Sequence, residues 1–210
     1  MNVLIACEYS GIVRDAFAAK GHDAWSCDLL PTERPGNHIQ GDVLEVLSNG
    51  WDLMIAHPPC TFLTVAANRW HRPEYAARFP TRNADRKEAV EFFMKFAEAD
   101  VPRIAIENPI GVMSTIYRKP DQVVQPYYFG DDERKATCLW LKGLPKLVYQ
   151  KTDTLFEQKT VVEPAIIYHA SGRTDGRLHF ETLKLSKVER AKARSKTFQG
   201  LADAMADQWG

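Results

Sequence analysis

The sequence of 210 residues lacks several features that would place it in a specialised class. Its four cysteines lie far apart and form no Cys-x-x-Cys pair, which argues against a zinc site and against a disulfide framework. No apolar run approaches the roughly 20 residues that a membrane span needs. The formal net charge is zero, so any nucleic-acid binding must come from a local patch. These absences indicate a soluble domain with reduced thiols and no metal, and we expect a cytoplasmic protein without a membrane partner.

Short apolar runs alternate with amphipathic segments through the first half of the chain. We predict strands over 2–7, 23–27, 39–43, 51–56 and 103–107, and helices over 12–20 and 83–99. The second half is less regular, with a strand over 137–141, a weak strand over 165–168, a polar helix over 186–195 and a closing helix over 201–209. This alternation predicts an α/β fold with a mostly parallel, doubly wound, Rossmann-like sheet that is covered on both faces.

The most informative stretch is an apolar strand that ends in two prolines and a thiol, Pro58-Pro59-Cys60. Neither proline has an N–H and each restricts the residue before it, so the chain must turn outward there. The turn places Cys60 at the carboxyl edge of the sheet, where open α/β folds bind their ligands. Cys60 is therefore a candidate nucleophile, whereas Cys7, Cys27 and Cys138 lie inside apolar runs and are expected in the core.

Polar or reactive residues follow one predicted strand after another. Since the carboxyl ends of parallel strands share one edge, these side chains can converge on one crevice. Carboxylates after the second and third strands can accept hydrogen bonds from ribose hydroxyls and from an exocyclic amine. A thiol and a nearby carboxyl can add to an electron-poor ring and protonate it. The residues concerned are Glu8, Ser10, Asp28, Asp42, Cys60 and Glu107; taken singly, Asp28 and Asp42 are also ordinary turn or helix-cap residues.

In chain order, these pieces resemble the DNA cytosine-5 methyltransferases. Pro58-Pro59-Cys60 is similar to the family's Pro-Cys nucleophile motif, and Ile106-Glu107-Asn108-Pro109 is similar to its Glu-Asn-Val motif. The stretch 6–11 stands where the family carries its first S-adenosylmethionine loop, and 41–43 matches its adenine-binding segment. The stretch 129–140, with Arg134 and Lys135, resembles the basic motif before a strand, and 198–202 resembles the closing cofactor motif.

The sequence departs from this family in four places. The first loop has fewer glycines, Asp132 and Ala136 interrupt the basic motif, and no asparagine follows Gly200. The stretch between 140 and 186 leaves little room for a large domain that reads the DNA sequence. The chain therefore resembles the compact members of the family found in phages and prophages.

The resemblance implies S-adenosylmethionine as cofactor and double-stranded DNA, with a flipped-out cytosine, as substrate. It assigns Cys60 to the attack on C6, Glu107 to the ring nitrogen N3, and Arg134 to the base or a phosphate. The cofactor contacts that it implies are Glu8, Tyr9, Ser10, Gly11, Asp28, Leu29, Asp42, Val43, Pro58 and Gly200. The basic and aromatic residues expected to face DNA are Arg69, Trp70, Arg72, Arg78, Arg82 and Lys135.

The resemblance also divides the chain into three parts. Residues 1–150 correspond to the catalytic core, 151–185 to a short irregular segment in place of a recognition domain, and 186–210 to helices that complete the cofactor site. Three alternatives stay open. They are the same chemistry on a free cytosine nucleotide, a non-catalytic protein that binds DNA or cofactor, and a thiol hydrolase with His57 as its base.

Overall fold

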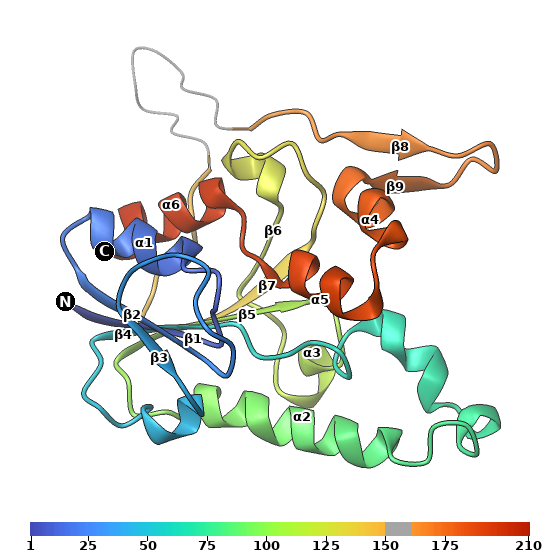
Figure 1. Cartoon of the computed structure of the whole chain (residues 1–210), viewed down its shortest axis with the longest axis horizontal. Coiled ribbons are helices and arrows are strands. Elements are labelled where there is room, and N and C mark those ends of the chain that lie inside the picture. Colours follow the sequence, from blue (N-terminus) through green and yellow to red (C-terminus); the bar gives the residue numbers. More distant parts are fainter. Residues whose placement is uncertain (150–160) are drawn as a thin grey trace.

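A central sheet of seven strands organises the molecule in the computed structural model, which describes residues 1–149 and 161–210 (Figure 1). The strand order is β3-β2-β1-β4-β5-β7-β6, and β7 runs antiparallel to the other six strands. This arrangement confirms the predicted fold class, an α/β fold with a Rossmann-like, doubly wound and mostly parallel sheet. The strands are β1 (Asn2–Ala6), β2 (Asp23–Asp28), β3 (His38–Gln40), β4 (Leu53–Ala56), β5 (Arg103–Pro109), β6 (Gln122–Val124) and β7 (Thr137–Lys142).

Helices cover both faces of the sheet. Helices α1 (Ile12–Ala19) and α6 (Gln199–Trp209) pack on one face, and α2 (Arg82–Ala97) covers the other (Figure 1). Strand β1 supplies both cores: Val3 and Ile5 pack with α1 and α6, whereas Leu4 and Ala6 pack with the α2 side. A strand buried on both faces reads as a continuous apolar run, which explains why these strands could be found from the sequence.

Several shorter elements complete the described part of the chain. They are α3 (Met113–Ile116), α4 (Arg177–Glu181), α5 (Lys187–Ser195), the hairpin of β8 (Ile166–Tyr168) and β9 (Thr174–Gly176), and five 3-10 turns at Val43–Glu45, Val65–His71, Pro73–Tyr75, Pro126–Phe129 and Thr182–Lys184. The sequence did not predict β6, β9, α3 or α4, because elements of three to five residues carry too little periodicity. Helix α2 begins after Thr81 rather than at Asn83 or Asp85, and the Thr81 hydroxyl donates to Asp85. Within the described ranges, no helix is long and apolar enough to cross a membrane.

The hairpin and α4 are tied to the core by one arginine. Arg177 donates two hydrogen bonds to Asp132, at 2.6 and 2.8 Å, and one to Glu133 at 2.9 Å. The buried carboxylate of Glu133 also accepts from the backbone N–H of Leu178. Asp132, which departs from the family's basic motif, therefore anchors this small unit. Part of the segment predicted as irregular, 150–160, lies outside the described residues.

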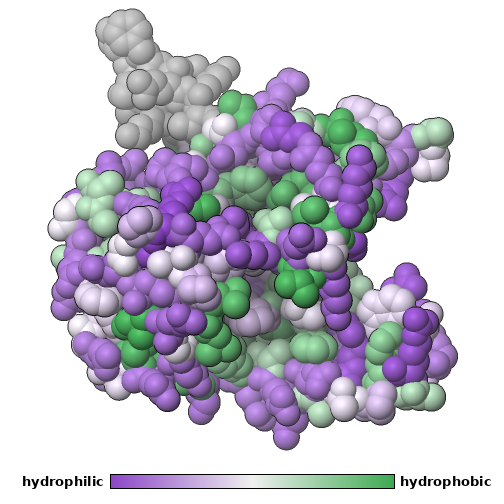
Figure 2. Space-filling model, viewed as in Figure 1, coloured by the Kyte–Doolittle hydropathy of each residue, from purple (hydrophilic) through white to green (hydrophobic). Residues whose placement is uncertain are grey.

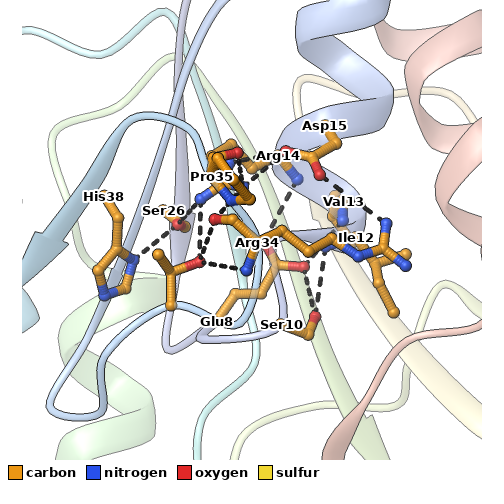
Figure 3. Close-up of polar contacts among 11 residues, drawn as sticks. Glu8, Ser10, Ile12, Val13, Arg14, Asp15, Ser26, Arg34, Pro35 and His38 are labelled. Atoms are coloured by element: carbon orange, nitrogen blue, oxygen red, sulfur yellow. Dashed lines mark hydrogen bonds and ion pairs between the residues drawn. The ribbon is translucent and has the colours of Figure 1, made fainter.

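A buried arginine shapes the loop that follows β2 (Figure 3). Arg14, only 1% exposed, pairs with Asp15 and donates to the hydroxyl of Thr32 and to the carbonyls of residues 34 and 35. A buried guanidinium needs such partners, because an unpaired buried charge is costly. Gly11 has a φ of +74°, and a Cβ there would lie 2.5 Å from the guanidinium. Glycine at this position therefore makes room for Arg14.

Candidate active site at the carboxyl ends of β4 and β5

Side-chain bonds continue the pairing of β4 and β5 where the backbone ladder stops. The ladder ends at Ala56, because the prolines that follow have no N–H to donate. Beyond it, His57 Nδ1 lies 2.7 Å from Glu107 Oε2, and the amide nitrogen of Asn108 donates to the carbonyl of Pro58 at 2.7 Å. These two contacts fix the loop that carries the candidate nucleophile against the end of β5.

A cavity of about 420 Å³ opens at this edge of the sheet. Such a volume falls within the range of small-molecule sites, roughly 300–1,000 Å³. The cavity brings together the three predicted catalytic residues, Cys60, Glu107 and Arg134, with Pro58 and Lys135. Figure 2 shows the surface hollowed between two parts of the chain, the segment after Cys60 below and the β8–β9 unit with α4 above. The convergence expected of the strand ends is therefore present for the chemical half of the site.

The sequence did not identify several residues of the cavity wall. Leu178 and His179 come from α4, and Arg194 and Ser195 come from the end of α5. No motif marks these residues, and only the packing of the small unit against the core brings them to the cavity. His57 was noted in the sequence only as a possible base for a hydrolase, since its carboxylate partner lies 50 residues away.

Glu107 is buried and held as a carboxylate. Burial alone would raise its pKa, but the charge of Lys135 and the hydrogen bond from His57 outweigh burial and lower the pKa to about 2. At neutral pH this side chain accepts hydrogen bonds and donates none. The sequence led us to expect a carboxylic acid that protonates a ring; the structure instead presents an ionised acceptor in the free protein.

Cys60 is exposed at the cavity, where its surroundings act on the pKa of its thiol in opposite directions. Burial of the sulfur in the concave wall raises the pKa, Lys135 opposes this shift, and the negative charge of Glu107 adds to it. The ammonium group of Lys135 thus acts on both the thiol and the carboxylate. This residue, predicted to face DNA, lies inside the cavity, where its Nζ donates to the carbonyl of Lys196.

A second, smaller cavity of about 40 Å³ lies beside the first at the end of β1. Tyr9 contributes to its wall and donates from its hydroxyl to the carbonyl of Lys192 at 2.6 Å, which fastens α5 over the site. His57 lines both cavities and forms part of the wall between them. The residues around the smaller cavity are Cys7, Glu8, Tyr9, Ser10, His57, Ser195, Lys196 and Thr197.

The N–H groups at the start of α1 are taken up by a side chain of the protein itself. The carboxylate of Glu8 accepts from the N–H groups of Val13 and Arg14 and from the hydroxyl of Ser10 (Figure 3). This buried carboxylate satisfies the N-terminal donors of the helix. Gly11 lies against the Arg14 guanidinium, and its predicted contact with a cofactor stays a prediction.

The predicted ribose and adenine contacts lie around the ends of β2 and β3. Asp28 and Asp42 each accept one local backbone hydrogen bond, from Leu30 and Leu44 respectively. Both carboxylates lie close enough to the end of β1 to raise the pKa of Cys7, whose burial is the larger cause. Leu29 is 73% exposed and offers an apolar surface next to Asp28, whereas the Val43 side chain is buried in the core.

Gly200 packs closely against a neighbouring turn and lines neither cavity. A Cβ on this residue would lie 2.0 Å from the carbonyl oxygen of Phe129, and its N–H donates to Asp131 at 2.9 Å. Neither cavity wall includes it. The first turn of α6 therefore requires glycine here for close contact with the turn at Pro126–Phe129.

Replacing Gly200 by alanine is expected to lower the free energy of unfolding by about 1–3 kcal/mol through overpacking. The measurement is the midpoint of urea unfolding. Gly41→Ala is the matched control, because no atom lies within 4 Å of the added Cβ and its φ is not positive. Equal midpoints for the two variants would contradict the close-contact explanation.

The basic and aromatic stretch after Cys60 divides into packed and exposed residues. The Arg69 guanidinium lies 4.0 Å from the centre of the Trp70 ring, and that ring meets Tyr75 and Phe79 edge to face. Arg82 also packs over Phe79, at 5.7 Å. Trp70 and Arg82 therefore contribute to a local cluster and not to the cavity wall.

Three arginines of this stretch stay exposed: Arg69, Arg72 and Arg78. None lines the cavity, but Thr64 and Ala66 of the same segment do, so the segment borders its mouth. The assignment of these three arginines to DNA stays a prediction. Among the described residues, no group of three or more His, Cys, Asp or Glu side chains could hold a metal ion.

Comparison with known proteins gives matches among solved structures but none at the level of sequence families. No protein-family model and no curated protein matches the sequence. One similar solved structure is a candidate DNA modification methyltransferase encoded within a prophage of E. coli. The two chains share 16% identity with a TM-score of 0.42, over 67% of this chain and 46% of the other. The match spans less than half of that protein.

Proposed function

We propose that this protein is a DNA methyltransferase that transfers a methyl group from S-adenosylmethionine to C5 of a cytosine through a covalent adduct with Cys60. One observation carries the proposal: Cys60 and the ionised Glu107 line the same cavity at the ends of adjacent parallel strands. A thiol and a carboxylate placed together in this way suit addition to an electron-poor ring. A protein that only binds DNA has no use for this pair.

The chain's own residues account for the steps that precede and follow methyl transfer. The sulfur of Cys60 bonds to C6 as its proton passes to N3, and the electrons of the C5–C6 double bond move toward C5. The carboxylate of Glu107 accepts a hydrogen bond from the proton on N3 and stabilises it. Arg134 and Lys135 supply positive charge next to the ring, from the wall of the same cavity. After methyl transfer, water takes the C5 proton, the C5–C6 double bond reforms as the C6–S bond breaks, and the N3 proton returns to the sulfur.

The residues around the strand ends fit the nucleoside part of S-adenosylmethionine. This cofactor supplies an activated methyl group when it is bound. The carboxylates of Asp28 and Asp42 can accept from ribose hydroxyls and from an adenine amine, and the exposed Leu29 offers a surface for the ring. The amino-acid end fits the polar side of the smaller cavity, where Lys196 can pair with a carboxylate.

The exposed arginines at the mouth of the cavity provide a test of DNA binding. Changing Arg69 and Arg72 together to glutamine is expected to weaken DNA binding and to reduce the slope of log K against log salt by roughly 2, because about 0.9 counterions are released per phosphate contact. The measurement is a salt titration of binding by fluorescence anisotropy. Lys87→Gln with Lys95→Gln on α2 is the matched control of equal charge. An unchanged slope in the arginine variant would show that this segment does not face DNA.

The proposed substrate is tested by labelled methyl transfer to duplex DNA and, in parallel, to dCMP. We expect tritium from labelled S-adenosylmethionine to appear in DNA, and bisulfite sequencing to locate it at cytosine. Transfer to dCMP but not to DNA would show that the substrate is a free nucleotide. Absence of transfer to both, with cofactor binding intact, would favour a binding protein and contradict the proposal.

A further inference from the structure

His57 occupies a central position that the family resemblance does not explain. Its ring lines both the Cys60 cavity and the smaller cavity at the end of β1, and only 9% of its side chain is exposed. Its Nδ1 atom lies 2.7 Å from Oε2 of Glu107. His57 therefore contacts the Glu107 carboxylate and lines both the Cys60 cavity and the smaller cavity.

The surroundings of the two ring nitrogens determine which of them carries the proton. An ionised carboxylate can only accept, so Nδ1 must donate to Glu107. Within the described ranges Nε2 is buried and has no hydrogen-bond partner. His57 thus engages Glu107 through Nδ1–H, while its second ring nitrogen lies buried beside the two cavities.

This bond limits how Glu107 can be oriented. The carboxylate sits at the end of a strand, its Oε2 is engaged by Nδ1, and Asn108 ties the next residue of β5 to the loop of Pro58. Rotation of the carboxylate would break the bond to His57 in the dry interior of the site. The geometry therefore holds one face of Glu107 toward the cavity before any substrate arrives.

We infer that His57 is a positioning residue for Glu107: its Nδ1–H fixes the carboxylate so that it meets the polar edge of a pyrimidine bound beside Cys60. The inference rests on the proposed function for its substrate, but not for the state of the carboxylate. The titratable and charged groups that line the two cavities with His57 are Cys7, Glu8, Tyr9, Cys60, Glu107, Arg134, Lys135, His179, Arg194 and Lys196.

Three substitutions separate the roles of the two nitrogens. The amide nitrogen of His57→Asn can take the place of Nδ1, that of His57→Gln reaches the place of Nε2, and His57→Leu provides neither. We expect His57→Gln and His57→Leu to lower kcat roughly 10- to 100-fold, because that factor corresponds to the free energy of one hydrogen bond to a charged group. KM for the methyl donor is expected to change little. Asn is expected to recover most of that loss. His22→Asn, at the far end of α1, is the matched control.

Two readouts distinguish positioning from a general effect on folding. The acid limb of the kcat profile is expected to move to higher pH in the Gln and Leu variants, because loss of the donor raises the pKa of Glu107. The same shift is expected in an NMR titration of carbon-13-labelled glutamate, with the Glu107 signal assigned from its absence in Glu107→Gln. The Asn variant is expected to titrate as the wild type does.

The outcomes separate this inference from the proposed function. If His57→Asn loses as much activity as His57→Leu, or if His57→Gln is as active as the wild type, the inference is overturned. The proposed methyl transfer would not be affected by either result. A wild-type protein that transfers no methyl group would overturn the proposed function, and the NMR titration would still decide whether Nδ1 holds Glu107 ionised. An unchanged Glu107 titration in the Leu variant would overturn the inference in either case.

Discussion

Replacement of Cys60 by alanine is expected to abolish methyl transfer, with kcat lowered by a factor on the order of 10³ or more. Without the sulfur no bond forms at C6, so C5 gains no electron density and does not accept a methyl group. Cys60 is exposed at the cavity and supports no core packing, so the variant is expected to unfold at the same urea concentration as the wild type. Tritium transfer to duplex DNA measures the loss.

Cys27→Ser is the matched control for this result. Cys27 is fully buried in β2 and lines neither cavity, so this substitution changes a thiol away from the reacting atoms. We expect this variant to keep the methyl transfer that Cys60→Ala loses. Methyl transfer at the wild-type rate by Cys60→Ala would rule out the covalent route.

Glu107→Gln is expected to lower both activity and stability. The amide keeps the shape of the side chain but removes the buried charge that accepts from His57 and lies in the field of Lys135. Replacing the charged acceptor of this hydrogen bond by a neutral one is expected to lower the free energy of unfolding by about 1–3 kcal/mol. The amide also loses the negative charge that stabilises a proton on N3, so kcat is expected to fall by on the order of 10²-fold.

The difference in the free energy of unfolding between the wild type and Glu107→Gln is expected to become smaller as pH falls. The pKa of Glu107 is about 2 in the folded protein, against roughly 4.3 in an unfolded chain. A lowered pKa stabilises the folded state above the unfolded value, and this contribution disappears as pH falls from about 4 to 2. Urea midpoints measured at pH 7 and at pH 3 test this: the gap should narrow at the lower pH. A gap that widens there would mean that the carboxyl is protonated in the folded protein.

The sequence contained enough information for the sheet and for the chemical half of the site. Strands such as β1 and β4 are continuous apolar runs because both faces are buried, and the two prolines after β4 force Cys60 to the sheet edge. Glu107 lies at the end of the adjacent strand, so parallel pairing alone brings it to the same edge. These placements follow from local rules and strand order.

Tertiary contacts that no local pattern marks were not predicted. Gly11 makes room for Arg14, and Gly200 makes room for the carbonyl of Phe129. The carboxylate of Glu8 caps α1 while the residue also lines the smaller cavity, and the cofactor contacts assigned to these three residues stay predictions. The contact between His57 and Glu107 was not predicted, because 50 residues separate them and no motif links them.

Covalent trapping tests the account most directly. A duplex that carries 5-fluorocytosine keeps the enzyme bound after methyl transfer, because fluorine cannot leave C5 as a proton does. With S-adenosylmethionine present, we expect a stable protein–DNA adduct whose peptide map places the bond at Cys60, and no adduct from Cys60→Ala. A bond at another residue, or methylated cytosine formed from ordinary DNA without any trapped adduct, would contradict the central claim that this thiol adds to the base.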